Sequence, residues 1–364
     1  MNEFNAVWEN RNAPEFLLNA ANLSRISPHL LYISKQLIAP IDGEPSKLKI
    51  LADTAIKIVT DGEHKLFRID EDVVFNPATN LDEGYTLTGG KDYHVYLVAG
   101  LGTTADIVVS RNATCPANAS MDNSRRIGGF HTVCEDIDEF VPNTHSLYGY
   151  LAGNILPQSV WDLLNRPATC QPQGMVKDPK TGVWIDIYLS SGLQTSKSMY
   201  KGIVAANASF DELQESLSAV GKRMLTDAEF TSAAMGTEAY RIADNVQTNL
   251  DDASVYMTGG NSNVGGNRIV SDIGCEDMCG YFWQAIGQQS GTDYAVAGQT
   301  TYTWEDAVPS GEGRQLLPSN IVVAGGSILT PNYAGARCRN VANSRHFRNA
   351  HIGTRGCANS LAVV

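Results

Sequence analysis

Near its C-terminus the chain reads GGSILTPNYAGARCRNVANSRHFRNAHIGTRGC, residues 325–357. This segment lies in a stretch, residues 321–364, that contains no Asp, Glu, Lys, Gln, Met or Trp, although the whole chain has 39 acidic residues. The same stretch contains Arg337, Arg339, Arg345, Arg348 and Arg355. Such a bias is unusual for the end of a globular domain. It indicates codons that follow a special rule, and it favours a variable binding surface.

Length and charge limit the possible functions. A chain of 364 residues can hold two or three domains. Its net charge of −12 argues against a body that binds nucleic acid, and the tail arginines lack the interleaved aromatic residues of a nucleic-acid-binding patch. No segment has the length and apolar character of a membrane span, and no signal peptide is visible. We therefore expect neither nucleic acid as a partner nor membrane insertion.

The histidines and acidic runs do not form a recognisable catalytic or metal site. His131 follows Gly-Gly-Phe without a nucleophile motif, so a histidine packed at a turn is the better interpretation. His346 and His351 are five positions apart, the wrong spacing for two metal ligands on a helix. The acidic run 135–139 lacks the central Gly of a calcium loop. We expect no catalytic residue, metal or cofactor.

The cysteines leave one question open. Seven is an odd number, which argues against a full disulfide framework. Cys275 and Cys279 have the spacing of a helical turn, but no second Cys or His pair completes a zinc site. Cys338 and Cys357 are possible disulfide partners, and the sequence does not decide between paired and free thiols.

Local patterns predict a β-rich first half and two short helices. Ser209-Phe-Asp-Glu212 and Thr226-Asp-Ala-Glu229 are capping boxes, each of which opens a helix. Residues 111–145 are rich in Asn, Ser, Asp and Pro and are expected to form loops around the apolar insert 127–131. A helix-like pattern covers residues 14–38, with Asp61-Gly62 as a later hairpin turn. The expected strands are Leu48–Val59, Lys65–Ile69, Val73–Phe75, Asp92–Ala99, Ala105–Ser110 and Val183–Leu189.

Within the tail, Gly and Arg frames enclose a mixture of unrelated side chains. The frames are Gly325-Gly326, residues 334–337 and residues 352–356. The residues between them do not alternate between apolar and polar, so we expect many of their side chains to face solvent. Exposed Tyr333, Phe347, His346 and Arg348 would suit a recognition surface, because aromatic residues and Arg supply much of the binding energy at interfaces.

This frame resembles the variable region of proteins that are diversified by diversity-generating retroelements. The resemblance extends upstream and covers residues 90–364. Its motifs occur in the family's order: SRRIGGFH (124–131), SVWDLLNRP (159–167), GMVKDPKTGVWIDIYL (174–189), GKRMLTDAEFTSAAMGT (221–237) and GCEDMCGYFW (274–283). In this family adenines of template codons of the AAC type are replaced at random. The new codons still end in a pyrimidine, so Lys, Glu, Gln, Met and Trp cannot arise.

The resemblance implies an α+β fold in which a C-terminal C-type-lectin domain follows β-rich N-terminal domains. The expected division is an N-terminal β-rich assembly region at 1–88 and a small β-sandwich-like domain at 89–165. The display domain then covers 166–364, with the variable region at 325–356.

The resemblance also assigns roles to residues of the tail. Scaffold roles, with Gly at positive φ or close approach and buried Arg bonded to loops, fall on Gly325, Gly326, Gly335, Arg337, Gly353, Arg355 and Gly356. Ligand contacts fall on Ser327, Leu329, Thr330, Asn332, Tyr333, Val341, Asn343, His346, Phe347, Arg348, Asn349 and His351. Many relatives carry Trp where Ile328, Val341 and His346 stand, so these three are either diversified here or shifted in register.

The implied function is binding of a host-cell surface ligand, a protein rather than a glycan, by a homotrimer in the tail tip or fiber of a virion. Two alternatives remain. One is a formylglycine-generating-type Cys oxidase of the same fold, which needs a close pair of reactive Cys, whereas Cys338 and Cys357 are nineteen positions apart. The other is a cellular adhesin at the cell surface.

Overall fold

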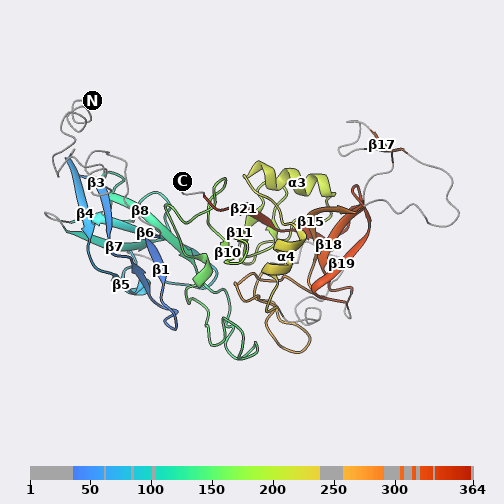
Figure 1. The fold of residues 1–364 in the computed structure, drawn as a ribbon, viewed down its shortest axis with the longest axis horizontal. Helices are drawn as coiled ribbons and strands as arrows, with labels where there is room; N and C mark the ends of the chain where they lie inside the picture. The colour runs from blue at the N-terminus through green and yellow to red at the C-terminus, as the bar shows by residue number, and fades with distance from the viewer. Residues whose placement is uncertain are drawn as a thin grey trace, which may run out of the picture.

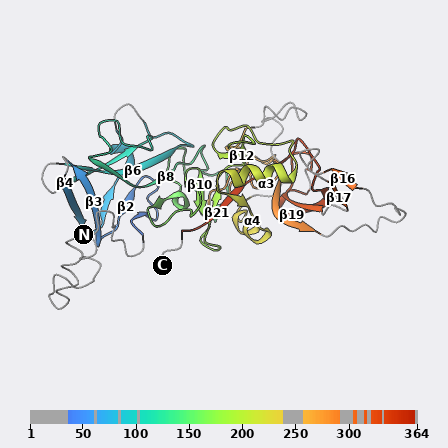
Figure 2. The same ribbon diagram turned by 90° about the horizontal axis from the view of Figure 1, so that it is seen from above.

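The computed structural model describes residues 36–60, 63–82, 86–100, 104–237, 257–290, 304–306, 314–316, 320–330 and 333–361. The chain forms an elongated body (Figure 1). Strands β1 to β9 occupy one end, α3, α4, β15, β18 and β19 the other, and β10, β11 and β21 the middle. The view from above shows the same order (Figure 2). Among the described residues, no helix is both long and apolar enough to cross a bilayer.

The first half consists of antiparallel sheets around one apolar core. A three-stranded sheet has the order β1-β2-β5, a four-stranded sheet the order β7-β6-β8-β9, and β3 pairs with β4. Most of the buried apolar side chains of these strands form one cluster, which includes Ile38, Ile56, Tyr93 and Phe130. The strands are β1 Ile38–Pro40, β2 Leu48–Ile50, β3 Thr54–Thr60, β4 Glu63–Ile69, β5 Val73–Phe75, β6 Asp92–Ala99, β7 Ala105–Ser110, β8 Ser124–His131 and β9 Trp161–Asp162.

Two expectations for this half need correction. The loops expected over residues 111–145 are interrupted by a strand that was not predicted, because the apolar insert 127–131 belongs to β8, Ser124–His131. Its glycines admit close neighbours: a Cβ on Gly128 would lie 2.3 Å from the Trp161 carbonyl oxygen. The single strand expected over Leu48–Val59 is divided into β2 and β3 at Asp53, whose φ is +58°.

In the second half, the described residues form two four-stranded sheets, two helices and shorter strand pairs. One sheet has the order β10-β11-β21-β14 and the other β19-β18-β15-β20. Strand β11 is shorter than the expected Val183–Leu189. The elements are β10 Met175–Lys177, β11 Val183–Asp186, β12 Ser190–Ser191, β13 Lys197–Ser198, α3 Phe210–Ala219, β14 Arg223–Met224, α4 Asp227–Ala233, β15 Trp283–Ser290, β16 Trp304–Asp306, β17 Arg314–Leu316, β18 Asn320–Gly325, β19 Gly335–Ser344, β20 Ile352–Thr354 and β21 Gly356–Asn359. The 3-10 helices η2 Pro77–Thr79 and η3 Pro157–Ser159 belong to the first half.

Both capping boxes are confirmed. The Ser209 hydroxyl accepts a hydrogen bond from the Glu212 amide, and Thr226 does the same for Glu229. Each glutamate side chain in turn accepts from the backbone amide of its cap residue. The strands expected at Val73–Phe75, Asp92–Ala99 and Ala105–Ser110 are confirmed with these bounds. Residues 14–35 of the expected helix, and the Asp61-Gly62 turn, lie outside the described residues. The expected domain division remains a prediction.

The two halves meet at a buried polar group. His131 lies between Asp92, 2.9 Å from its Nδ1, and the Tyr188 hydroxyl, 3.1 Å from its Nε2. Asp92 also accepts from the Gly174 amide. His131 is 2% exposed, so it packs within the structure as the sequence interpretation favoured.

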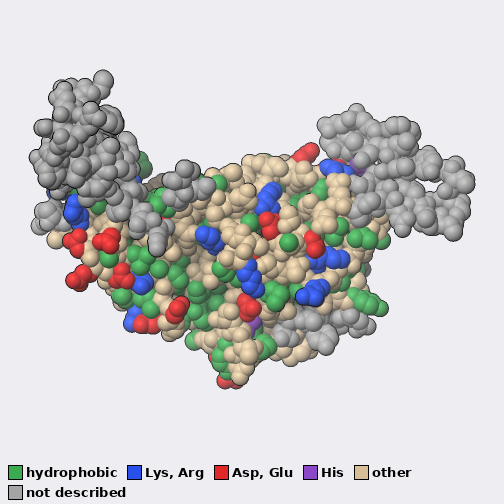
Figure 3. All heavy atoms as spheres, in the orientation of Figure 1, with side chains coloured by type: hydrophobic (Ala, Val, Ile, Leu, Met, Phe, Trp, Pro, Cys, Tyr) green, Lys and Arg blue, Asp and Glu red, His purple; other side chains and the backbone are tan. Residues whose placement is uncertain are grey.

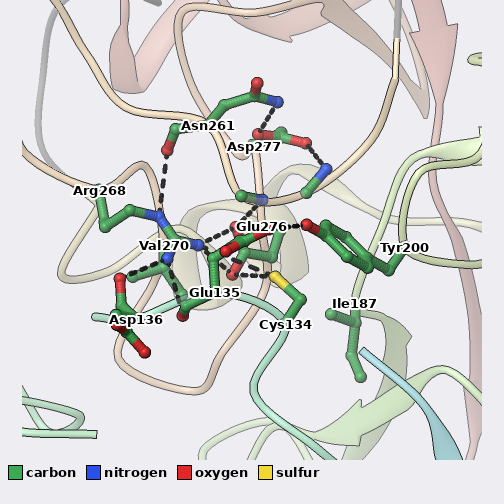
Figure 4. Close-up of polar contacts among 12 residues, drawn as sticks. Cys134, Glu135, Asp136, Ile187, Tyr200, Asn261, Arg268, Val270, Glu276 and Asp277 are labelled. Atoms are coloured by element: carbon green, nitrogen blue, oxygen red, sulfur yellow. Dashed lines mark hydrogen bonds and ion pairs between the residues drawn. The ribbon is translucent and has the colours of Figure 1, made fainter. Parts of the chain in front are cut away.

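A second buried group joins loops of the C-terminal half to the loop at residues 134–136, which follows β8 (Figure 4). The Arg268 guanidinium donates two bonds to the Glu276 carboxylate, at 2.7 and 2.8 Å, and two more to the carbonyls of Glu135 and Asp136. The neighbouring Asp277 accepts from the Gly259 amide and from Asn261. Burial, followed by repulsion from Glu276, raises the pKa of Asp277 to about 7. The group therefore ties residues 259–277 to the loop at 134–136.

Arg355 holds the C-terminal strands in place. The residue lies between β20 and β21 and is 1% exposed. It donates to the carbonyls of Asp186, Ile187 and Glu276, and to the side-chain oxygen of Gln284 at 3.2 Å. One side chain thus satisfies carbonyl groups from loops that are 79 to 169 positions away in sequence.

Replacing Arg355 by Met is expected to lower the free energy of unfolding by about 3–5 kcal/mol, because buried carbonyl groups would lose their donor. Urea denaturation measures the change. The matched control is Arg111→Met, an exposed arginine in the first half, for which we expect less than about 0.5 kcal/mol. Equal midpoints for both variants would contradict the structural role of Arg355.

Candidate functional site

Strand β19 is the edge of its sheet and the most exposed strand of that sheet. Among the described strands it pairs only with β18, in the order β19-β18-β15-β20. The residues of β18 are buried apart from Asn320, whereas every residue of β19 is at least partly exposed. In Figure 1 these strands lie at the end of the body opposite β3 and β4. Within the segment of unusual composition, β19 therefore forms an exposed face beside the buried strand β18.

Most of the residues expected to contact a ligand lie on this outer face. The exposed fractions are 73% for Tyr333, 53% for Leu329, 48% for Val341 and 40% for Phe347. Arg348 is also exposed. Intermediate exposure is found for Thr330, Asn343, His346 and Asn349. Asn332 lies outside the described residues.

Two of the expected contact residues point inward instead. Ser327 is 1% exposed, and its hydroxyl accepts from the Leu329 amide. His351 is 8% exposed, and its ring lies 6.2 Å from that of Phe282. A ligand on the surface cannot reach either side chain directly. Ser327 and His351 instead stabilise the loops that carry the exposed residues.

The expected scaffold glycines differ in what their positions require. Gly325 and Gly326 have φ of +89° and +83°, and a Cβ on Gly326 would lie 2.7 Å from the Ala334 Cα. Gly353 and Gly356 lie close to neighbours, with a Cβ on Gly356 only 2.6 Å from Asp186 Oδ2. Gly335 has no atom within 4 Å of such a Cβ. Four of the five positions are therefore constrained by the backbone or by packing, and Gly335 is open.

Arg337, expected to be buried and bonded to loops, is exposed. Arg339 is held instead. Its guanidinium donates to Asp227 and to the Thr231 hydroxyl at the start of α4, and it lies 5.0 Å from the Phe230 ring. The sequence analysis missed Arg339 as an anchor, because its partners are more than a hundred positions away.

Arg345 makes the same kind of contact with the other helix. Its guanidinium pairs with Asp211 in the first turn of α3 and lies 5.2 Å from the Phe210 ring. Arg348 pairs with Glu212 at 2.7 Å. Acidic residues in the first turn complement the positive end of a helix. The two helix starts therefore present carboxylates to arginines of a segment that has no carboxylates of its own.

Surface charge follows this arrangement. On the face shown in Figure 3, acidic side chains are frequent over the end that carries β3 to β5, whereas Lys and Arg side chains lie over the end that carries β19.

The pKa of Glu212 is lowered. Burial alone would raise it, but hydrogen bonds from Ser209 and Arg348 outweigh burial.

A hollow of about 770 Å³ lies beside β19. Its walls include Trp283, Tyr333, Arg337, Cys338 and Val341. Trp283 is the first residue of β15, outside the variable region, and no site role was predicted for it, although it ends the motif GCEDMCGYFW. The volume falls within the range of sites that bind small molecules or a few side chains of a partner.

The thiols and acidic groups show no metal or disulfide chemistry in the described part of the chain. Cys338 and Cys357 are both free, and burial raises the pKa of each thiol. A raised pKa favours the neutral thiol, which is a poor nucleophile. No cluster of three or more potential metal-binding side chains occurs among the described residues.

The glycine geometry predicts that substitutions at Gly326 and Gly335 differ in their effect on the free energy of unfolding. Gly326→Ala is expected to destabilise the protein by about 2 kcal/mol, because it combines a positive φ with a clash against Ala334. Gly335→Ala is the matched control and is expected to change stability by less than about 0.5 kcal/mol. Urea denaturation compares them. Similar losses for both would refute the constraint at Gly326.

The arginine anchors predict a measurable coupling. A double-mutant cycle with Arg345→Ala and Asp211→Ala is expected to give an interaction energy of about 1–2 kcal/mol, reduced by partial exposure of both groups. The control is Arg337→Ala, which should leave stability unchanged because the side chain is exposed. A coupling near zero would show that α3 does not hold β19 through this pair.

Comparison with known proteins supports the resemblance along most of the chain. Residues 41–162 match the sequence model of the Mtd second domain. The chain is 25% identical over 302 residues to the tail fiber receptor-binding protein of Bordetella phage BPP-1. The aligned region covers 76% of this chain and 73% of the relative. Two solved structures, the U1 and M1 variants of the major tropism determinant, each superpose with a TM-score of 0.70. They are 22% and 21% identical, and each match covers 90% of this chain and 84% of the other. Residues 41–162 thus resemble the Mtd second domain in sequence, and the chain resembles the major tropism determinants in fold along most of its length.

Proposed function

We propose that this protein is a receptor-binding protein of a phage tail that presents variable residues on β19 and its flanking loops. The observation that carries the proposal is the contrast between the outer face and its support. Tyr333, Leu329, Val341 and Phe347 are 40–73% exposed, while the strand beneath them is buried and Arg339, Arg345 and Arg355 are bonded. Side chains on such a face can be exchanged without loss of the support.

The scaffold would be a C-type-lectin domain in an α+β chain. Two short helices packed around small, mostly antiparallel sheets, with the display strand at a sheet edge, support this assignment. The likeness to the major tropism determinants supports it as well. The domain would display the variable residues, and the β-rich half would serve assembly.

The partner would be a molecule of the host-cell surface, a protein rather than a glycan. The name of the phage relative, a tail fiber receptor-binding protein, supports a place in the virion tail. We propose a homotrimer, in which three faces bind together and avidity offsets a weak single-site affinity. In this proposal the chain uses no cofactor or nucleic acid and acts by binding, without catalysis.

The test is binding of the purified full-length protein to cells from a panel of bacterial strains. For a strain that the protein binds, Tyr333→Ala and Phe347→Ala are each expected to weaken binding at least about tenfold, because exposed aromatic residues act as anchors. Their melting temperatures should match that of the unchanged protein.

Met121→Ala is the matched control, because Met121 is 72% exposed in the first half of the chain. Unchanged cell binding by both tail variants would overturn the proposed site. A large drop in their melting temperature would show that these side chains support the fold.

A further inference from the structure

The hollow beside β19 combines apolar walls with an exposed arginine. Trp283, Tyr333, Val341 and small residues such as Ala342 supply apolar surface. Among the lining residues that the structure describes there is no Asp or Glu. The two arginines of this lining differ: Arg339 is occupied by Asp227 and Thr231, whereas Arg337 is exposed. A ligand would therefore meet an aromatic wall and an exposed guanidinium with no carboxylate beside it among the described lining residues.

This chemistry selects among partners. A guanidinium presents paired N–H donors that match the two oxygens of a carboxylate. The aromatic and aliphatic walls gain free energy by covering apolar groups, which carbohydrates offer sparingly. A phosphate site would use several convergent donors, whereas Arg337 is the one exposed cation among the described residues of this lining.

We propose that the hollow binds a segment of a surface protein in which an aromatic or aliphatic side chain lies next to a carboxylate. The apolar side chain enters between Trp283 and Tyr333, and Arg337 pairs with the carboxylate. The inference rests on the proposed function, since it names the ligand chemistry of the same face. Trp283 supplies an aromatic wall from outside the variable segment, so it remains when the tail residues change.

Gly335 provides a direct way to fill the hollow. It lines the cavity, and a Cβ at this position meets no atom within 4 Å. Gly335→Phe would therefore place a ring in the space that the ligand needs, while the backbone keeps its course. Gly335→Ala is the smaller matched change.

The experiment uses the full chain and four small probes: indole-3-acetate, 3-methylindole, tryptamine and N-acetylneuraminic acid. Ligand-observed NMR measures their affinity. Indole-3-acetate is expected to bind with a Kd of about 1 mM, given its few heavy atoms, and tryptamine at least about tenfold more weakly. Arg337→Gln should weaken indole-3-acetate about tenfold without affecting 3-methylindole, and Gly335→Phe should remove all binding.

Arg111→Gln controls for the change in net charge and should have no effect. Equal binding of tryptamine and indole-3-acetate, or unchanged binding by Gly335→Phe, would overturn the proposal. So would the absence of binding by every probe at several millimolar.

Different combinations of probe binding and cell binding would refute the ligand class and the proposed function. Probe binding that depends on Arg337, together with cell binding that ignores Tyr333 and Phe347, would support the site and refute the receptor role. Cell binding that depends on Tyr333 and Phe347, together with no probe binding, would refute the ligand class alone. Stronger binding of N-acetylneuraminic acid than of indole-3-acetate would replace the protein segment by an acidic sugar and overturn the proposal.

Discussion

The C-terminal half depends on the hydrogen bonds of one buried arginine. Arg355 joins the ends of β20 and β21 to the carbonyls of Asp186, Ile187 and Glu276. A buried charge of this kind is stable only when its donors are satisfied. Because β20 pairs with β15, and β21 lies between β11 and β14, both sheets of this half are tied to the same side chain. Arg355 therefore fixes the position of the chain near the end of the segment with unusual composition.

Between the Gly325-Gly326 turn and Arg355, some residues anchor the segment to the helices and others present exposed side chains. Arg339 and Arg345 extend to the first turns of α4 and α3, where acidic groups and Phe rings hold them. The side chains between these anchors are exposed, and a hollow opens beside them. This arrangement explains why a segment without carboxylates can carry many arginines: the opposite charges come from two capping-box helices. It also explains how composition can vary locally while the strand stays in register.

Local signals in the sequence predicted a good part of this fold. Both capping boxes begin helices where Ser209 and Thr226 indicated, since a cap depends on residues three positions apart. The strand Asp92–Ala99 was likewise predicted from its own residues, but the half-buried alternation expected for it was wrong, because residues 93–97 are all buried. The strand β8 was missed, because its glycines are explained only by the approach of β6 and β9. Long-range partners were missed as well: Arg337 and Arg339 flank the same Cys338, and only the position of α4 distinguishes the exposed arginine from the anchored one. The burial of Ser327 and His351 likewise depends on Tyr281 and Phe282, which no local pattern connects to the tail.

The most direct test of a diversified face on a fixed support is the DNA sequence around this gene, together with sibling copies of the gene. The account predicts a near-copy of the codons for residues 325–356 beside a reverse transcriptase gene, with differences at adenines. The substitutions should fall at exposed positions such as Leu329, Tyr333, Val341 and Phe347, and spare Gly326 and Arg355. Absence of the near-copy, or substitutions as frequent at Gly326 and Arg355 as at Tyr333, would contradict it.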